Sequence, residues 1–431
     1  MGGIFDGIAD WFIGLPAWGQ ALGRVLILVL PILLLVPILI WWERRLLSWM
    51  QDRIGPNRVG PFGLLQTICD GVKLFFKEDI TPSSVDRFIY IVAPAVALFP
   101  AFAIGATLPI APHIAPWGAE SFYRFITPVA DVNIGVLYIF AISSLGVYGV
   151  VLAGYASNNK YSLMGGLRSS AQLISYELGM GMALAALVLA AGSLRMSDMV
   201  RVQEADLWGA VPALQNWFIL TPFGFVAGVV FLICMVAETN RAPFDLPEAE
   251  NELIAGYHTE YSSMKFAVFF MGEYAAMFLF AGIFTALFLG GHNALPLDWY
   301  ALGLPVVADI NYYLAPVIFL GKVFTLFSLY VWIRATLPRL RYDQLMSLGW
   351  RSLLPLAVTN FILVGLWILM VDLYGPLAGL GIAVGAGLLL YVFWRVAMNA
   401  TGDVPGLPRR QVRMVSDARP IESGETIVAG S

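Results

Sequence analysis

The stretch VLILVLPILLLVPILIWW, residues 25–42, carries no charged side chain. A helix needs about 20 mostly apolar residues to cross the hydrocarbon core of a bilayer, so this stretch predicts a membrane-spanning helix over 22–42. A secretory signal has a basic start and a much shorter apolar run, of roughly 7–15 residues. The run here is longer and follows no basic start, which predicts a retained helix rather than a cleaved signal.

The rest of the chain repeats this pattern. Of its 431 residues, 59% are hydrophobic and only 13% are charged, whereas soluble domains have about 25% charged residues. Lipid must therefore be the main solvent. The runs are long and lack the alternation of the roughly ten-residue strands in membrane barrels, so strands are not expected. We predict an all-α polytopic membrane protein with eight spans near residues 22–42, 87–108, 133–155, 171–192, 217–238, 266–290, 311–333 and 352–371, and an apparent ninth near 377–398.

Basic residues in the loops predict the orientation. Short cytoplasmic loops are enriched in Lys and Arg, and here these residues concentrate in segments 43–87, 156–170, 239–265 and 334–351 and in the tail. The loops on the other side carry few. This asymmetry predicts a short periplasmic N-terminus (1–21), an eight-helix membrane domain (22–371), the additional helix (377–398) and a flexible cytoplasmic tail (399–431).

Residues 63–77, GLLQTICDGVKLFFK, are too short and too polar to span a bilayer. Apolar residues recur at helical spacing among Asp70, Lys73 and Lys77. The pattern predicts an amphipathic helix that lies in the cytoplasmic membrane interface after the first span. A plain surface anchor is the simpler interpretation, and the pattern alone favours it. The alternative is one wall of an entrance for a lipid-soluble ligand.

The composition argues against several classes of function. A net charge of −4 gives no reason to expect nucleic acid as a partner. Cys69 and Cys234 lie far apart, and His113, His258 and His292 are scattered, so no metal site is predicted. The sequence also lacks nucleotide-binding, haem and iron–sulfur motifs. Any redox cofactor must therefore belong to partner subunits.

A few ionisable residues fall inside the predicted spans, where charge is costly and often functional. Glu177, Glu273 and Lys322 lie within the fourth, sixth and seventh spans. Glu238 ends the fifth span, and Asp131 begins the third. Structural ion pairs, such as Lys322 with a carboxylate, would explain single residues. A line of several polar residues across the bundle favours a proton relay instead.

The segment AETNRAPFDLPEAENELIAGYHTEY, residues 237–261, concentrates carboxylates beside a single arginine. A solvated acidic loop is the usual explanation, but apolar residues such as Phe244 and Tyr257 would bury part of it. Pro247 is placed to open a short helix with Glu248 and Glu252 on one face. Crowded carboxylates in a partly dry site raise one another's pKa. The segment therefore predicts a coupled cluster that holds shared protons near neutral pH.

Four segments together resemble one known family. They are WERRLLSWMQDRIGPNRVGPFGLLQTICDGVKLFFKED (42–79), NNKYSLMGGLRSSAQLISYELG (158–179), the acidic segment 237–261 and RATLPRLRYDQLMSLGW (334–350). In order and spacing they resemble the H subunit of bacterial NADH:quinone oxidoreductase, respiratory complex I. The resemblance runs from residue 22 to residue 371. It implies a membrane subunit at the joint between a redox arm and a proton-pumping arm.

The resemblance implies two sets of functional residues, carried over by matching motif. A quinone-binding passage would be formed by Glu43, Arg44, Arg53, Asp70, Arg241, Asp245, Phe270, Tyr274 and Arg334. A proton relay leading toward the pump subunits would be formed by Glu177, Glu238, Glu248, Glu250, Glu252, Glu260, Glu273 and Lys322. The family implies neither a metal ligand nor a cofactor within this chain.

The resemblance also implies a substrate, partner subunits and a membrane location. Quinone would be the substrate, with FMN and iron–sulfur clusters in partner subunits. Those partners would be the iron–sulfur and quinone-site subunits of the peripheral arm and the small and antiporter-like membrane subunits, all in contact with the lipid of the bacterial inner membrane. The family pattern ends after eight spans. The ninth segment and the tail lie beyond it, and we interpret them as a peripheral helix and a flexible extension.

Three alternatives stay open. The equivalent subunit of a membrane-bound hydrogenase would share the general pattern, but such relatives resemble segments 55–61 and 237–261 less closely. A stand-alone ion transporter would fit the helices and buried charges, although no internal repeat is visible. A scaffold without a role in chemistry would leave the crowded carboxylates unexplained.

Overall fold

Every predicted span is helical in the computed structural model, which describes residues 14–112, 129–207, 211–245 and 255–400. The helices are α2 (Ala17–Met50), α4 (Arg87–Gly105), α6 (Gly135–Ala156), α7 (Lys160–Ala191), α9 (Pro222–Glu238), α11 (Ser263–Phe288), α13 (Ala315–Thr336), α15 (Leu354–Tyr374) and α16 (Pro376–Ala400). Within the described ranges, seven helical segments are long and apolar enough to cross a membrane. The predicted class, an all-α polytopic membrane protein, is confirmed, while the number of crossings stays a prediction.

Local capping sets several helix boundaries. The Asn159 side chain accepts a hydrogen bond from the Tyr161 amide at the start of α7, and Gly192 ends that helix with a φ of 69°. Glycine adopts the left-handed backbone conformation at this position easily because it has no Cβ. The polar residues 160–170 continue the helix on the N-terminal side, so α7 begins at 160 rather than at 171, where the predicted span starts.

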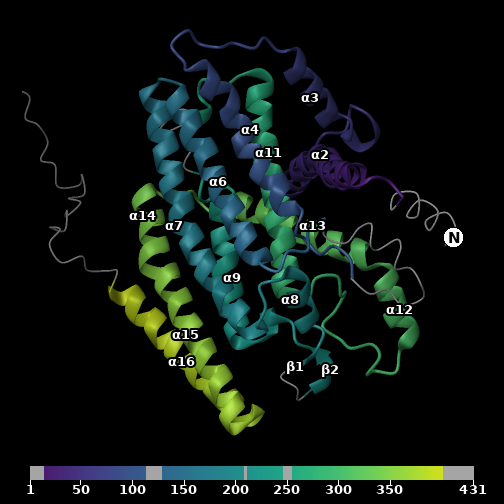
Figure 1. The fold of residues 1–431 in the computed structure, drawn as a ribbon. Coiled ribbons are helices and arrows are strands. Elements are labelled where there is room, and N and C mark those ends of the chain that lie inside the picture. Colours follow the sequence, from purple (N-terminus) through teal and green to yellow (C-terminus); the bar gives the residue numbers. More distant parts are fainter. Residues whose placement is uncertain (1–13, 113–128, 208–210, 246–254, 401–431) are drawn as a thin grey trace, which may run out of the picture.

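The long helices pack as a bundle with α7, α9 and α11 near its centre (Figure 1). Helix α4 packs on α6 and α11, and α13 packs on α2 and α11. Helices α15 and α16 lie side by side on one flank, where α15 contacts α7 and α9 (Figure 1). The largest core cluster joins buried side chains of α7, α9, α11 and α13, among them Tyr176, Phe231 and Phe288.

Shorter elements connect or extend the long helices. They are η1 (Pro61–Gly63), α3 (Gln66–Phe76), α8 (Met196–Val202), η3 (Phe218–Leu220), η4 (Gly256–His258), α12 (Pro305–Tyr313), α14 (Tyr342–Ser347) and η5 (Leu348–Leu353). Strand β1 (Asp206–Leu207) pairs antiparallel with β2 (Val211–Gln215). The expectation that the long apolar runs form no strands is confirmed, because this hairpin lies outside them, beside α8 and away from α3 (Figure 1).

Close packing of α4 against α6 leads to a first prediction. A Cβ on Gly149 would lie 2.6 Å from the backbone nitrogen of Ala97, whereas a Cβ on Gly146 would lie 3.8 Å from the Pro100 ring. We expect Gly149→Ala to lower stability by about 1–3 kcal/mol, the usual cost of overpacking. Thermal denaturation of the solubilised protein checks this, with Gly146→Ala as the matched control. Equal midpoints for the two variants would contradict the packing argument.

Candidate functional site

A buried carboxylate, Glu43, lies toward the C-terminal end of α2 and is only 4% exposed. It accepts a hydrogen bond from Arg241 Nη2 at 3.1 Å and one from the Tyr274 hydroxyl at 2.5 Å. It also forms an ion pair with Arg334 from the end of α13. These four residues, here called the Glu43 cluster, bring together α2, α11, α13 and the segment after α9. All four belong to the predicted quinone-binding set.

The cations of the cluster offset the free-energy cost of burying the Glu43 carboxylate. A buried charge is costly unless it is paired and hydrogen-bonded, and Glu43 has both kinds of partner. The Arg241 guanidinium also lies over two aromatic rings, 4.5 Å from the centre of Tyr274 and 6.0 Å from that of Phe270. Cation–π contact of this kind favours a desolvated guanidinium. The cluster is thus a polar site held rigidly within an apolar bundle.

Helix α3 packs against α2 and α11, which carry Glu43 and Tyr274, and it exposes apolar side chains. Its Asp70 carboxylate accepts a hydrogen bond from Arg44 of α2 at 2.5 Å, which ties the two helices together. The exposed apolar side chains of α3 and the turn before it are Leu64, Leu65, Ile68, Val72, Phe75 and Phe76. The predicted amphipathic helix is therefore present. Arg53 is exposed in the turn after α2, where its backbone amide bonds to Ser48, and it lies outside the Glu43 cluster.

Asp245 is buried but belongs to a different contact. Its carboxylate lies 3.4 Å from Arg339 of the segment after α13. The Gln172 amide of α7 donates to the carbonyls of Ala237 and Phe244, which fixes the segment 237–245 on the bundle. Glu248, Glu250 and Glu252 lie outside the described residues, as does the short helix predicted at Pro247.

Three other carboxylates of the predicted relay gather in the middle of the bundle. Glu177 of α7 accepts hydrogen bonds from Ser143 at 3.2 Å and Ser144 at 2.5 Å. Glu238 and Glu273 both line a cavity of about 90 Å³ between α4, α6, α9 and α11. Ser143 lines the same cavity, so all three carboxylates either line it or bond to its wall. We call this the carboxylate cavity.

Within the carboxylate cavity the hydrogen bonding is incomplete. The Tyr257 hydroxyl donates to Glu273 at 3.3 Å. One oxygen of Glu238, Oε2, is buried and has no hydrogen-bond partner among the described residues. Buried polar atoms are rarely left unpaired unless water or a functional partner satisfies them. A cavity of this volume has room for several waters, and water bound beside such an atom could satisfy it and carry protons between the carboxylates.

Glu260 lies at the edge of this region, beyond η4. Its carboxylate accepts a hydrogen bond from Asn159 at 2.7 Å, and its backbone carbonyl accepts one from the Tyr90 hydroxyl at 2.5 Å. Burial lowers the pKa of the neighbouring His258 to about 3, so this imidazole is neutral near pH 7.

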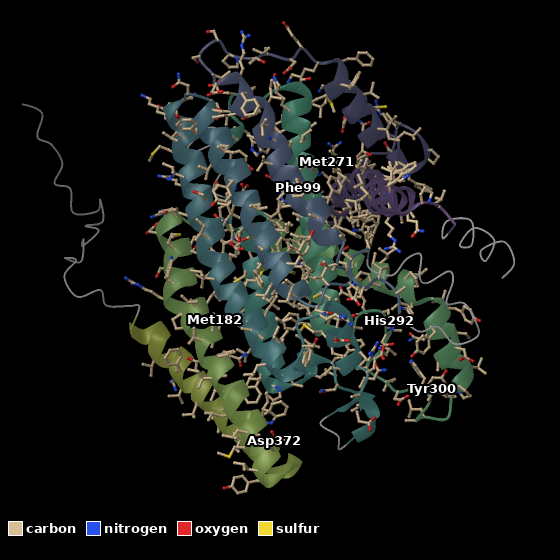
Figure 2. The ribbon with its side chains drawn as sticks, in the orientation of Figure 1. Phe99, Met182, Met271, His292, Tyr300 and Asp372 are labelled. Atoms are coloured by element: carbon tan, nitrogen blue, oxygen red, sulfur yellow. The ribbon has the colours of Figure 1, made fainter. Side chains whose placement is uncertain are left out.

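Lys322 lies apart from the carboxylate cavity. Its ammonium donates to the carbonyls of Leu289 at 2.5 Å and Gly291 at 3.2 Å, and also to that of Asn293. It lies 4.1 Å from the centre of the Trp217 ring. The loop that it binds contains His292, at the end of the bundle that bears the hairpin (Figure 2). In the described residues its partners are carbonyls rather than the carboxylate considered above.

These contacts predict that Lys322 stabilises the loop after α11. Lys322→Gln would leave carbonyls without a charged donor, and each unsatisfied buried group costs about 1–3 kcal/mol. We expect a lower denaturation midpoint and faster proteolysis of segment 289–293. Thr325→Val, which removes a hydroxyl bonded within its own helix, is the control. Full stability together with lost proton translocation would instead assign Lys322 to the relay.

Several polar partners were not predicted from the sequence. Ser143, Ser144, Tyr257 and Gln172 bond directly to the predicted site residues or to their segment. Hydroxyls and amides in apolar helices carry no signal in a hydropathy pattern. Only the pairing of helices reveals that they face the carboxylates.

Comparisons with known proteins identify the family of this chain. The profile of the family described as NADH dehydrogenase matches residues 23–365. An NADH-quinone oxidoreductase H subunit of Geobacter metallireducens is 46% identical over 81% of this chain and 96% of its own length. The H subunit of the same enzyme from Thermomicrobium roseum is 49% identical over 76% of this chain and 89% of its own. That of Ralstonia nicotianae is 46% identical over 80% and 91%.

Fold and site together define a polytopic helical membrane protein with a buried Glu43 cluster and a separate carboxylate cavity. The chain belongs to the family of H subunits of NADH-quinone oxidoreductases. The resemblance identified from the four motifs is confirmed, and so is the expectation of a subunit of an oxidoreductase complex. The family profile ends within α15, so α16 lies beyond the matched region.

Proposed function

We propose that this chain forms the membrane part of a quinone chamber and relays quinone reduction to proton translocation. The quinone would enter beside α3, whose exposed apolar side chains suit a lipid-soluble molecule. Its head group would approach the Glu43 cluster, where the cations and the Tyr274 hydroxyl supply hydrogen-bond donors. Arg44, Asp70 and Phe270 would line the approach, with Asp245 and Arg53 further out.

One observation carries the coupling proposal. Glu273 and Tyr274 are consecutive residues of α11, and they join different sites: Tyr274 donates to Glu43, whereas Glu273 lines the carboxylate cavity and accepts from Tyr257. Negative charge that develops on a reduced quinone near the cluster would raise the proton affinity of carboxylates one helix face away. Protons would then pass among Glu273, Glu238 and Glu177.

The wider assignment follows the family. The relatives are named as subunits of NADH-quinone oxidoreductase, and we propose that this chain assembles with subunits that hold FMN and iron–sulfur clusters and with antiporter-like membrane subunits. The described part of the chain contains no group of three or more metal-binding side chains. The bacterial inner membrane, a periplasmic N-terminus and a cytoplasmic tail complete the proposal.

A photoreactive quinone analogue tests the chamber. In the assembled complex it is expected to label segments 43–79 and 263–274, and unlabelled quinone should compete. Tyr274→Phe, which keeps the ring and removes the hydroxyl, should weaken the competition, whereas Asp298→Asn in the turn before α12 should not. Labelling confined to partner subunits would contradict the chamber. Co-purification of a nickel–iron subunit would favour the hydrogenase alternative.

A further inference from the structure

An apolar groove opens on the flank of the bundle between α9, α15 and α16. Its volume is about 410 Å³, within the roughly 300–1,000 Å³ that small-molecule sites occupy. Phe225 and Val229 of α9, Leu356 of α15 and Tyr391 of α16 line it, and Gly387 of α16 forms a recess. Phe225 and Tyr391 are more than half exposed, at 55% and 56%.

The groove is formed in part by α16, the helix that lies beyond the match to the family profile. The family profile ends at residue 365, whereas Gly387, Leu390 and Tyr391 all belong to α16. Helix α16 packs along α15 and also touches α9 and η5. It therefore adds a third wall to what would otherwise be a two-helix surface. The site is separate from both the Glu43 cluster and the carboxylate cavity, whose lining residues it does not share.

Positive charge lies at one end of this groove. Arg395 follows Tyr391 by four residues and Gly387 by eight, so all three lie on one face of α16. Arg351 lies in η5, the segment that packs against α16. Both arginines are exposed, and neither belongs to an ion pair found among the described residues. Asp372 lies far away, near the opposite end of α15 (Figure 2).

We propose that this groove binds an anionic phospholipid. One acyl chain would occupy the recess at Gly387, and the phosphate would lie against Arg395 and Arg351. An apolar trough that ends at exposed arginines matches an amphiphile with an acidic head, since basic pockets between membrane helices bind such head groups. A partner helix would fill the apolar trough but would leave the arginine pair without a counter-charge.

Photolabelling in the assembled complex tests the site. The probe is phosphatidylglycerol with a diazirine on one acyl chain, and phosphatidylcholine with the same chain is its comparison. We expect the phosphatidylglycerol probe to label peptides from 222–229 and 387–391 at least about fivefold more than the phosphatidylcholine probe. Arg395→Gln should remove most of that preference. Equal labelling by the two lipids would overturn the proposal.

The two glycines of α16 provide a matched pair of variants. A Cβ at Gly387 or at Gly385 would meet no atom within 4 Å, so both positions accept a side chain. Gly387→Leu places that side chain in the groove and should abolish labelling there. Gly385→Leu, which is outside the lining, should leave labelling unchanged. Unaltered labelling in Gly387→Leu, or a cross-link from Tyr391 to a partner subunit in place of lipid, would contradict the assignment.

Discussion

Glu43→Gln is expected to lower NADH-driven quinone reduction by at least about tenfold. The substitution keeps the shape of the side chain but removes the counter-charge of Arg241, which is 4% exposed and pairs with Glu43 at 3.1 Å. Breaking a buried ion pair costs about 3–5 kcal/mol of stability and displaces its partners. A loss of about 1.4 kcal/mol of transition-state stabilisation through the displaced donors lowers the rate tenfold. The Tyr274 hydroxyl would also lose a charged acceptor.

The assay must separate the chamber from the rest of the complex. NADH oxidation by a soluble acceptor, which does not use the membrane site, should persist in Glu43→Gln. Asp198→Asn is the control, because its ion pair with Arg201 is 3.9 Å long and both side chains are at least one third exposed. Exposed pairs contribute only about 0–1 kcal/mol. Quinone reduction at the normal rate in Glu43→Gln would contradict the proposal that the Glu43 cluster forms part of the quinone chamber.

Glu238→Gln is expected to separate proton translocation from electron transfer. Glu238 lines the carboxylate cavity, its Oε2 has no hydrogen-bond partner among the described residues, and Gln at this position cannot exchange a proton. Positioned proton transfer contributes about 10²–10⁴-fold in enzymes, so the rate of translocation should fall at least about tenfold. Electron transfer to quinone should be less affected, because Glu238 lines a cavity that no member of the Glu43 cluster lines.

Proton movement into vesicles, measured beside NADH oxidation in the same preparation, checks this second prediction. Glu78→Gln, at an exposed position outside both predicted sets, should leave the ratio unchanged. Glu248→Gln is expected to act like Glu238→Gln on the basis of its sequence motif, although it lies outside the described residues. Normal proton translocation in both variants would contradict the proposed relay.

The spans and the family were predictable because their signals are local. A run such as 25–42 predicts a helix of the observed type from length and polarity alone, and the same holds for each of the other spans. Long motifs such as 42–79 identify the family because many residues agree within one segment. The small hairpin β1–β2 was missed, since strands of two and five residues are too short to leave a detectable alternation.

The residues of the Glu43 cluster were named from the sequence, but their grouping was not. Glu43 pairs with Arg241 and Arg334 across sequence separations of 198 and 291 residues. Hydropathy predicts which residues lie within the membrane. It does not predict which neighbouring helix each residue contacts. Likewise, the family motif put Lys322 with the relay, a role that stays a prediction, and only the structure shows that its ammonium donates to three carbonyls.

The apolar runs of this sequence by themselves determined an all-helical membrane protein, because each run satisfies its own backbone hydrogen bonds in lipid. The charged residues inside those runs were predicted as functional candidates because charge within a membrane is costly. Only the tertiary structure decided that Glu273 and Tyr274, neighbours on α11, contact different sites. Side chains of consecutive helical residues point about 100° apart. The packing of α2 on one side of α11, and of α4 and η4 on the other, therefore decides that Tyr274 meets Glu43 and Glu273 meets Tyr257.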